Sequence, residues 1–210
     1  FFIAPGTYSL TTTITLTPPN QGSYHFYGAG ADSTIVQAGA GTLTLFSIGS
    51  PLTDPSVFFE NLTFKDGAQS NITLIGTGLG LALRFLRCRF YVAVASAIGI
   101  DLGSDSRFCR VQLCEFIGPS GTAINVSGDF ALVVEGCHFL SVSKPLTINN
   151  GVQIILVDNT LDTCGPITFT GNSFGGFNVF SGNHFNNPAS RCFEFLSGLN
   201  TNSSITIDGN

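Results

Sequence analysis

Three charged residues of this chain stand at nearly equal intervals, each immediately before a phenylalanine in the same repeated pattern. They are Arg89, Glu115 and His138. If the fold stacks them, the carboxylate or the imidazole becomes a candidate general base with charge partners beside it. The same arrangement also describes a surface salt-bridge ladder, which contributes little to stability. We favour the salt-bridge ladder and keep the three residues as a catalytic candidate of lower rank.

The elements that position these residues follow from an eight-residue word that recurs along the chain. Successive words close on Phe64, Phe90, Phe116, Phe139, Leu161 and Phe185, at nearly constant intervals. A second word follows each first one and begins at Ile72, Ile98, Ile124, Leu146, Ile167 and Phe193. Both words alternate apolar and polar residues, which predicts strands with one buried face. Strands this short bury that face only when successive coils stack, so the chain is predicted to be a solenoid.

Stacked coils place equivalent residues above one another, about 4.8 Å apart. The closing residues then form one buried column, and a second buried column contains Phe59, Phe85, Val111, Val134, Leu156 and Phe180. A third column, the ladder, lies two residues before the closing residue and contains Leu62, Cys88, Cys114, Cys137, Asn159, Asn183 and Asn210. We expect the ladder asparagines to hydrogen-bond up the column and to adopt the left-handed conformation of a tight turn.

Several of these words resemble the pectin-lyase-like superfamily. They are G-N-x-F at 182–185, D-N-x-L at 158–161 and the strand G-T-A-I-N-V-S-G at 121–128, and the opening segments 1–16 and 24–36 are similar to first coils of that superfamily. The resemblance implies an all-β fold, a single-stranded right-handed parallel β-helix, and the spacing of the repeated words predicts about 6–7 rungs with 21–27 residues in each. Because the superfamily contains lyases, hydrolases, epimerases, viral tailspikes and adhesins, the resemblance does not define an activity.

We expect one β-helix domain over residues 1–210, with irregular first coils at 1–50 and regular rungs at 51–210. The chain starts at Phe1 without a methionine, and neither end reads as a polar cap for the apolar core. An open solenoid end exposes unpaired backbone groups. The chain is therefore predicted to be a segment of a longer polypeptide. Its expected partners are further copies of itself, or a parent assembly, that cover the ends.

Six cysteines are present, three of them in the ladder. We favour buried free thiols for Cys88, Cys114 and Cys137, although neighbouring rungs are also close enough for a disulfide. Cys164 and Cys192, which are separated by close to one rung and lie outside the ladder, are the better candidates for a disulfide. No metal site is predicted, because no C-x-x-C pair occurs and thiols stacked in a line do not form a tetrahedron. No cofactor is predicted either.

A polysaccharide-cleaving enzyme of this fold would need reactive groups on an exposed strand face, and a hydrolase needs two nearby carboxylates. The outward residues of the second word are almost neutral: Thr73, Gly99, Asp101, Asn125, Ser127, Thr147, Asn149, Thr168, Thr170 and Glu194. Asp101 and Glu194 are expected about four rungs apart, roughly 19 Å, which is too far for paired catalysis. The motifs that we associate with polygalacturonases and pectate lyases are absent. The nearly neutral face, the distant carboxylates and the missing motifs together argue against an enzyme.

Composition narrows the location and the partners. The net charge is −5 and only 10% of the residues are charged, so the chain has no basic footprint for nucleic acid. No apolar run approaches the roughly 18 residues of a membrane span. An even number of cysteines and four N-x-S/T sequons favour an extracellular protein or one on a cell or virion surface; the candidate glycosylation sites are Asn61, Asn71, Asn125 and Asn202.

The favoured function is a structural or adhesive β-helix module displayed at a surface, in a fibre, filament or virion spike. Its face would be polar and glycosylated, and glycans are candidate partners. The alternative is a polysaccharide lyase, hydrolase or epimerase of the pectin-lyase-like superfamily. A weaker alternative is ice binding by outward threonines such as Thr147 and Thr168, in a row that Asn125 and Gly99 interrupt.

Overall fold

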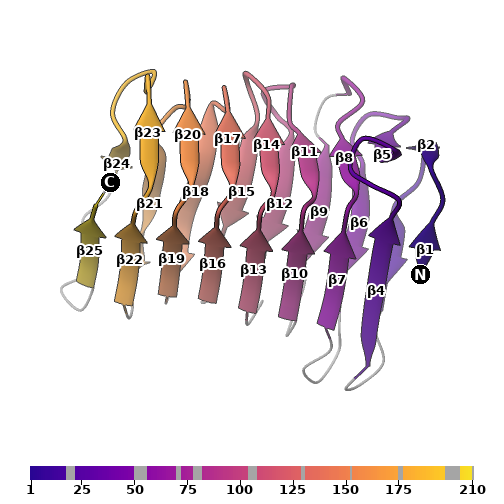
Figure 1. Cartoon of the computed structure of the whole chain (residues 1–210), viewed down its shortest axis with the longest axis horizontal. Helices are drawn as coiled ribbons and strands as arrows, with labels where there is room; N and C mark the ends of the chain where they lie inside the picture. Colours follow the sequence, from indigo (N-terminus) through magenta and orange to yellow (C-terminus); the bar gives the residue numbers. More distant parts are fainter. Residues whose placement is uncertain are drawn as a thin grey trace.

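The structure is a computed structural model that describes residues 1–17, 22–49, 56–69, 72–77, 82–103, 108–128, 131–151, 153–174, 177–196 and 204–209. All regular secondary structure in these residues is β-strand. The strands form three parallel sheets, and each coil contributes one strand to each sheet (Figure 1). The fold is therefore the parallel β-helix that the repeat and the resemblance predicted.

Within each sheet, every strand pairs with the equivalent strands of the coils before and after it. Sheet A contains β1 (Phe2–Ile3), β4 (Ser23–Gly28), β7 (Ser56–Glu60), β10 (Ala82–Leu86), β13 (Phe108–Gln112), β16 (Ala131–Glu135), β19 (Gln153–Val157), β22 (Phe177–Ser181) and β25 (Ser204–Asp208). Sheet B contains β2 (Gly6–Leu10), β5 (Thr34–Ala38), β8 (Thr63–Lys65), β11 (Arg89–Tyr91), β14 (Glu115–Ile117), β17 (His138–Leu140), β20 (Thr160–Asp162) and β23 (His184–Asn186). Sheet C contains β3 (Ile14–Leu16), β6 (Thr44–Ile48), β9 (Thr73–Thr77), β12 (Ile98–Leu102), β15 (Thr122–Val126), β18 (Lys144–Gly151), β21 (Ile167–Phe174) and β24 (Phe193–Phe195).

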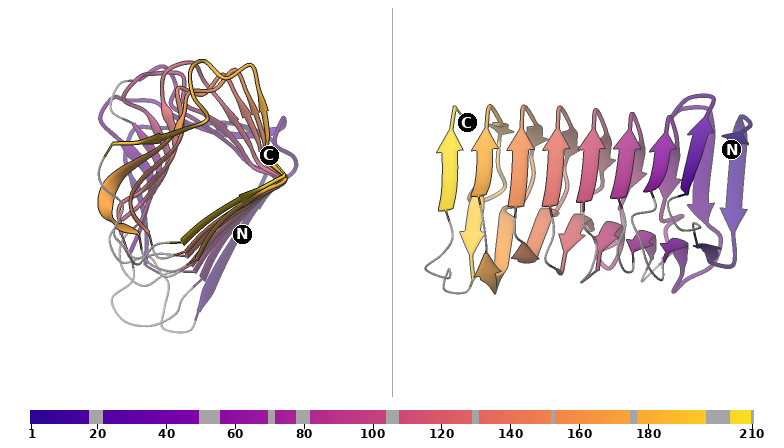
Figure 2. Two further views of the ribbon diagram at one scale, coloured as in Figure 1. Left: turned by 90° about the vertical axis from the view of Figure 1, so that its left-hand side faces the viewer. Right: turned by 90° about the horizontal axis from the view of Figure 1, so that it is seen from below.

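The coil is right-handed and encloses one apolar interior. In Figure 1 the strands of sheet A rise at the front, those of sheet C descend at the back, and the chain advances from right to left. The end view in Figure 2 shows the three sheets as walls around the interior. Six complete coils run from β7 to β24, in agreement with the 6–7 regular rungs predicted after residue 50. Two further coils, β1–β3 and β4–β6, precede them.

Coil length explains why the first coils look irregular in the sequence. Ser23 pairs with Ser56, and Ser56 pairs in turn with Ala82, so the coil that begins at β4 is longer than the coil that begins at β7. Further along, Ala131 pairs with Gln153, and the coil between them is shorter still. The extra residues of the early coils lie between strands, so the sheets continue in register although the sequence repeat does not.

The two predicted apolar columns are confirmed as neighbouring stacks in the core. The rings of Phe90 and Phe116 lie nearly parallel with their centroids 4.8 Å apart, and those of Phe59 and Phe85 are 5.4 Å apart. Phe85 meets Phe90 edge-on, with an interplanar angle of 75°. Offset stacks joined by edge contacts are the arrangements that aromatic rings prefer. The closing column is in register throughout, from Phe64 through Phe90, Phe116, Phe139 and Leu161 to the half-buried Phe185.

The asparagine part of the ladder hydrogen-bonds as predicted, at the turn from sheet A into sheet B. Oδ1 of Asn159 accepts the backbone N–H of Cys137 at 2.9 Å. Nδ2 of Asn159 donates to the carbonyl of Val134 at 3.0 Å and to Oδ1 of Asn183 at 2.9 Å. Each amide therefore satisfies buried backbone groups on neighbouring coils, which would otherwise cost free energy. Asn210 lies outside the described residues.

The cysteine part of the ladder repeats this pattern with sulfur. The backbone N–H of Cys114 donates to Sγ of Cys137 at 3.4 Å, and the Cys137 thiol donates to the carbonyl of Val111 at 3.5 Å. Cys88 relates to its neighbours in the same way, because its N–H donates to Sγ of Cys114 at 3.4 Å. The thiols thus take the place of the asparagine amides, as weaker donors and acceptors.

The expectation that the ladder asparagines are left-handed is wrong. Positive φ angles occur at the residue before each ladder position: Asn61, Arg87, Leu113, Gly136, Asp158, Gly182 and Gly209. The ladder side chain has to point into the core to reach its partners, so the preceding residue turns the chain. Where this preceding residue is not glycine, its side chain avoids the core, and that of Leu113 is 55% exposed.

The predicted register of sheet C is wrong in its first half. Ile100, and not Ile98, pairs with Ile124, and on its other side Ile100 pairs with Ile75. The physical reason is the length of the segment between sheets B and C: Phe90 pairs with Phe116 and Ile100 with Ile124, so this segment is two residues longer before β12 than before β15. Within β12 itself, two successive residues are buried. Gly99, which was predicted to point outward, is therefore buried. From Ile124 onward the predicted pairs are confirmed.

All six cysteines are free in the structure, so the predicted disulfide between Cys164 and Cys192 is not present in it. Ile167 pairs with Phe193, which places Cys192 level with Pro166, two residues beyond Cys164. The Cys164 thiol instead points inward and donates to the carbonyl of Phe139 at 3.2 Å. Two cysteines offset in this way do not have the facing geometry that a disulfide requires.

Candidate functional site

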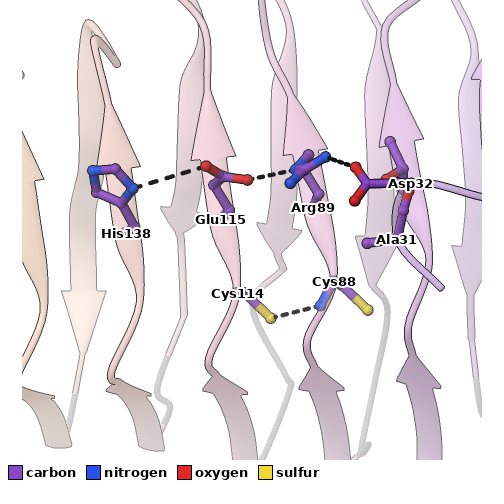
Figure 3. A network of polar contacts seen from close by, with 8 residues as sticks. Ala31, Asp32, Cys88, Arg89, Cys114, Glu115 and His138 are labelled. Carbon is purple, nitrogen blue, oxygen red and sulfur yellow. Dashed lines mark hydrogen bonds and ion pairs between the residues drawn. The ribbon is translucent and has the colours of Figure 1, made fainter.

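The three charged residues singled out by their spacing lie side by side on the outer face of sheet B. Arg89, Glu115 and His138 begin β11, β14 and β17 and are in register. Nε of Arg89 donates to one carboxylate oxygen of Glu115, and Nδ1 of His138 lies 3.8 Å from the other (Figure 3). Nη1 of Arg89 also pairs with Asp32. The fold brings the predicted cluster together and adds a fourth member.

Asp32 lies between β4 and β5, in the irregular second coil. The backbone beside it is held in place because the buried Thr63 hydroxyl donates to the carbonyl of Ala31. Asp32 stands 57 residues before Arg89 and belongs to none of the repeated words, so no periodic signal marked it. Its side chain is 84% exposed, which leaves this end of the network open to water.

Arg89 keeps its charge in this setting. Partial burial lowers the pKa of its guanidinium, but the hydrogen bonds to Glu115 and Asp32 outweigh burial and raise the pKa above the usual value for arginine. Both carboxylates are thereby bound to a permanently charged partner. A general base has to be available to take up a proton, so this arrangement favours the salt-bridge ladder over catalysis.

A second row of paired polar groups crosses the outer face of sheet A. Nη2 of Arg110 and Nε2 of Gln112 both donate to Oε2 of Glu135, each at 2.9 Å. The hydrogen bond from Arg110 is the main reason why the pKa of Glu135 is lowered. On earlier coils, Nε2 of His25 lies 3.3 Å from Oε2 of Glu60. The charged groups of both faces therefore join neighbouring coils to one another.

An open groove lies on the same face of sheet A, where β7, β10 and β13 begin. Its volume is about 290 Å³, and its lining includes Ser56, Phe58, Ala82, Arg84 and Phe108. Ala82 pairs with Ser56 on one side and with Phe108 on the other, so a small side chain separates a hydroxyl from an aromatic ring. The sequence did not indicate this groove, because its lining combines two outward columns over three coils. Ser56, Ala82 and Phe108 belong to one column, and Phe58 and Arg84 belong to the other.

The outer face of sheet C holds the separated carboxylates that the sequence predicted. Asp101, Asn125, Thr147, Thr168 and Glu194 form one column, so Asp101 and Glu194 are four coils apart. Oδ1 of Asp101 accepts a hydrogen bond from Nδ2 of Asn125 at 2.7 Å. Oε1 of Glu194 lies 3.7 Å from a guanidinium nitrogen on its own coil. This separation does not match either carboxylate geometry of glycoside hydrolysis.

The threonine row proposed for ice binding presents little surface. Thr147 and Thr168 are neighbours in register, as predicted. Thr168, however, is only 8% exposed. A row this short and this buried gives the ice-binding alternative little support.

The four candidate glycosylation sites remain predictions. Asn61 is half-buried at the corner between sheets A and B. Nδ2 of Asn125 donates to Asp101 and, at 3.2 Å, to the hydroxyl of Ser127. Asn71 and Asn202 lie outside the described residues.

Among the described residues, no group of three or more histidine, cysteine, aspartate and glutamate side chains has a geometry that would hold a metal ion. The described residues also contain no helix that is long and apolar enough to cross a membrane.

Comparison with known proteins gives no family assignment. No protein-family model and no curated protein matches the chain. Among solved structures, the chain is similar to the catalytic domain of a GH87 alpha-1,3-glucanase in complex with tetrasaccharides, at 10% sequence identity and a TM-score of 0.32. The match covers 98% of this chain and 63% of the glucanase chain. A similarity this low carries no information about activity or ligand, so any function has to be argued from the site.

Proposed function

We propose that this chain is a rigid, non-catalytic β-helix module that acts by display and adhesion. The main support is the mutual pairing of its outward charges. Arg89 bonds to Glu115 and Arg110 to Glu135, so these pairs tie one coil to the next, and the pair of Arg89 with Asp32 spans two coils. Such pairs neutralise a stacked surface and are not arranged to attack a substrate. A display module needs a regular scaffold and a recognition surface, and it needs no reactive group.

The proposed setting is extracellular, or the surface of a cell or virion, where the module would form part of a fibre or filament. Glycosylation and association with further copies or with a parent assembly belong to this proposal, and glycans are the proposed ligands. Asn61 suits glycosylation because it lies on an outer corner of the coil, where a sugar would extend away from both sheets. Mass spectrometry of protein from its native source tests this part of the proposal.

An activity assay tests the proposal as a whole. The chain would be incubated with neutral and acidic polysaccharides, and reducing ends and the absorbance of unsaturated sugars would be measured. We expect no product above that of a heat-denatured control. Glu115→Gln and His138→Gln should each change the free energy of unfolding by less than about 1 kcal/mol, as for exposed ion pairs. Product formation that Glu115→Gln abolishes would overturn the proposal in favour of the enzyme alternative.

A further inference from the structure

We infer that the groove on sheet A binds one anionic sugar residue, that is, a sugar ring bearing a carboxylate or a sulfate. This inference deepens the adhesive function proposed above and rests on it. It concerns a different face from the ladder of Arg89 and from the carboxylates of sheet C.

A small side chain lies beside an aromatic ring in this groove, and we call the space over it the slot. Ser56, Ala82 and Phe108 are successive members of one outward column, and Ala82 is the small member beside the 41% exposed ring of Phe108. Rings on adjacent coils of this protein stack at 4.8 to 5.4 Å, as Phe90–Phe116 and the core pair on sheet A show. A flat ring seated over Ala82 would lie at a similar distance from Phe108. The apolar face of a sugar ring has the size and the flatness for this place.

A cation stands at the other wall of the slot. Arg84 is exposed, its guanidinium lies 5.3 Å from the centre of the Phe58 ring, and its Nη2 donates to the neutral side-chain oxygen of Gln112 at 3.1 Å. Within the described part of the chain no carboxylate pairs with Arg84, in contrast to Arg110, which bonds to Glu135. A guanidinium positioned by a ring and an amide can bind a carboxylate or a sulfate with two parallel hydrogen bonds.

The surroundings favour the same ligand class. Phe58 is itself stacked on His25, with ring centroids 4.3 Å apart, so the wall behind Arg84 is a pair of stacked rings. The Ser56 hydroxyl at the far end of the slot can accept or donate a hydrogen bond, as a sugar hydroxyl requires. A volume of about 290 Å³ is at the lower end of ligand sites and suits one sugar residue rather than a long oligosaccharide.

Binding would be measured by isothermal titration calorimetry and by a glycan array, with the whole chain. The probes are oligosaccharides of galacturonate, a sulfated dextran oligosaccharide and neutral dextran of the same length. The carboxylated and sulfated arms distinguish the two sources of anion. We expect at least one anionic probe to bind and neutral dextran to bind about tenfold more weakly or not at all.

Three variants locate the site. Arg84→Gln removes the cation, and Ala82→Phe fills the slot with a ring that stacks on Phe108; each should weaken binding at least about tenfold. Arg87→Gln is the matched control, because it removes the same charge from an exposed residue of the same coil outside the groove, and it should leave binding within about twofold. Circular dichroism and thermal melting check that Ala82→Phe is folded. If it is not, Phe108→Ala, at an exposed position, replaces it.

Each of three results would overturn the inference. The first is that no anionic probe binds at millimolar concentration, and the second is that Arg87→Gln weakens binding as much as Arg84→Gln. The second result would mean that bulk charge attracts the probe. Equal binding of neutral dextran would also overturn the anionic specificity. These failures are separate from failure of the proposed function, which the release of cleaved product would show whether or not the groove binds.

Discussion

At the scale of single residues, the ladder shows that a thiol can stand in for an amide at a buried turn. Cys137 accepts a backbone N–H and donates to the carbonyl of Val111, as Asn159 does one coil later to the carbonyl of Val134. Sulfur is a weak donor and a weak acceptor, so the cysteine half of the ladder satisfies the backbone less well than the asparagine half. The ladder is therefore a place where stability can be added without changing the fold.

Cys137→Asn should raise the free energy of unfolding by about 1 kcal/mol, the net value of a typical hydrogen bond, because it extends the asparagine ladder by one coil. Urea unfolding followed by circular dichroism measures this. Cys137→Ala is the control. It removes both sulfur contacts and should lower the free energy of unfolding by about 1–3 kcal/mol. An asparagine variant that is less stable than the alanine variant would contradict the interpretation.

Burial of the thiols also predicts a pH dependence. Burial raises the pKa of Cys164 to about 11, and it raises the pKa of Cys109 and Cys114 as well. In the unfolded chain a thiol ionises near pH 8.5. A folded pKa above the unfolded value gives stability that is present below the unfolded pKa and is lost as pH rises toward the folded pKa. Stability should therefore fall between about pH 8.5 and pH 11.

Urea midpoints measured across this range should decline more gently for Cys164→Ala than for the unmodified chain. Cys192→Ala is the matched control, since Cys192 is only half-buried, and it should change the slope less than Cys164→Ala does. Identical slopes for all three proteins would show that the Cys164 thiol is not protected from ionisation by the fold.

At the scale of strands, stability comes from columns that cross the coils. Phe116 lies fully buried between Phe90 and Phe139 in the closing column. Thr160 is in sheet B too, but on the outward side of β20. Because inward and outward residues alternate within such short strands, only substitutions at the inward positions should change the packing of the core.

Phe116→Ala should lower the free energy of unfolding by about 3–5 kcal/mol, the range for truncating a packed aromatic ring. Thr160→Ala should change it by no more than about 0.5 kcal/mol. Chemical denaturation of both variants measures these changes in the free energy of unfolding, with one common value for its dependence on denaturant concentration. Equal effects would mean that the inward and outward assignment of sheet B is reversed.

At the scale of the whole molecule, each coil contacts mainly its two neighbours, so the array is close to a one-dimensional stack. The register supports this view, because Glu115 pairs with His138 at the equivalent position of the next coil. Removing residues 115–137 would join Cys114 to His138 and restore the ladder, with Phe90 facing Phe139.

The chain without residues 115–137 should still fold as a β-helix with one coil fewer. The dependence of its unfolding free energy on denaturant should fall by about a tenth, in proportion to the surface that is lost. The control removes residues 115–126, about half a coil, which brings a sheet A strand to a sheet B position. That protein should not fold cooperatively. A folded half-coil deletion, or an unfolded full-coil deletion, would contradict the one-dimensional description.

The sequence by itself determined the coil and the order of residues within the columns of sheets A and B. Each of the six coils from β7 onward carries the same word there, and a tight turn of constant length joins its two strands, so the spacing between Phe59 and Phe64 is the same as that between Phe85 and Phe90. A constant local length makes sequence register and spatial register identical. The ladder and the neighbouring positions of Arg89, Glu115 and His138 could be predicted for this reason.

Only the tertiary structure decided the registers and contacts that depend on segments of variable length. The segment between sheets B and C changes in length from coil to coil, which shifted the register of sheet C, and the long second coil brought Asp32 to Arg89 across 57 residues. The groove beside Arg84 likewise requires side chains of three coils and two columns. The physical reason is that periodicity reports only what repeats, whereas these contacts form where the coil departs from its repeat and residues distant in sequence meet.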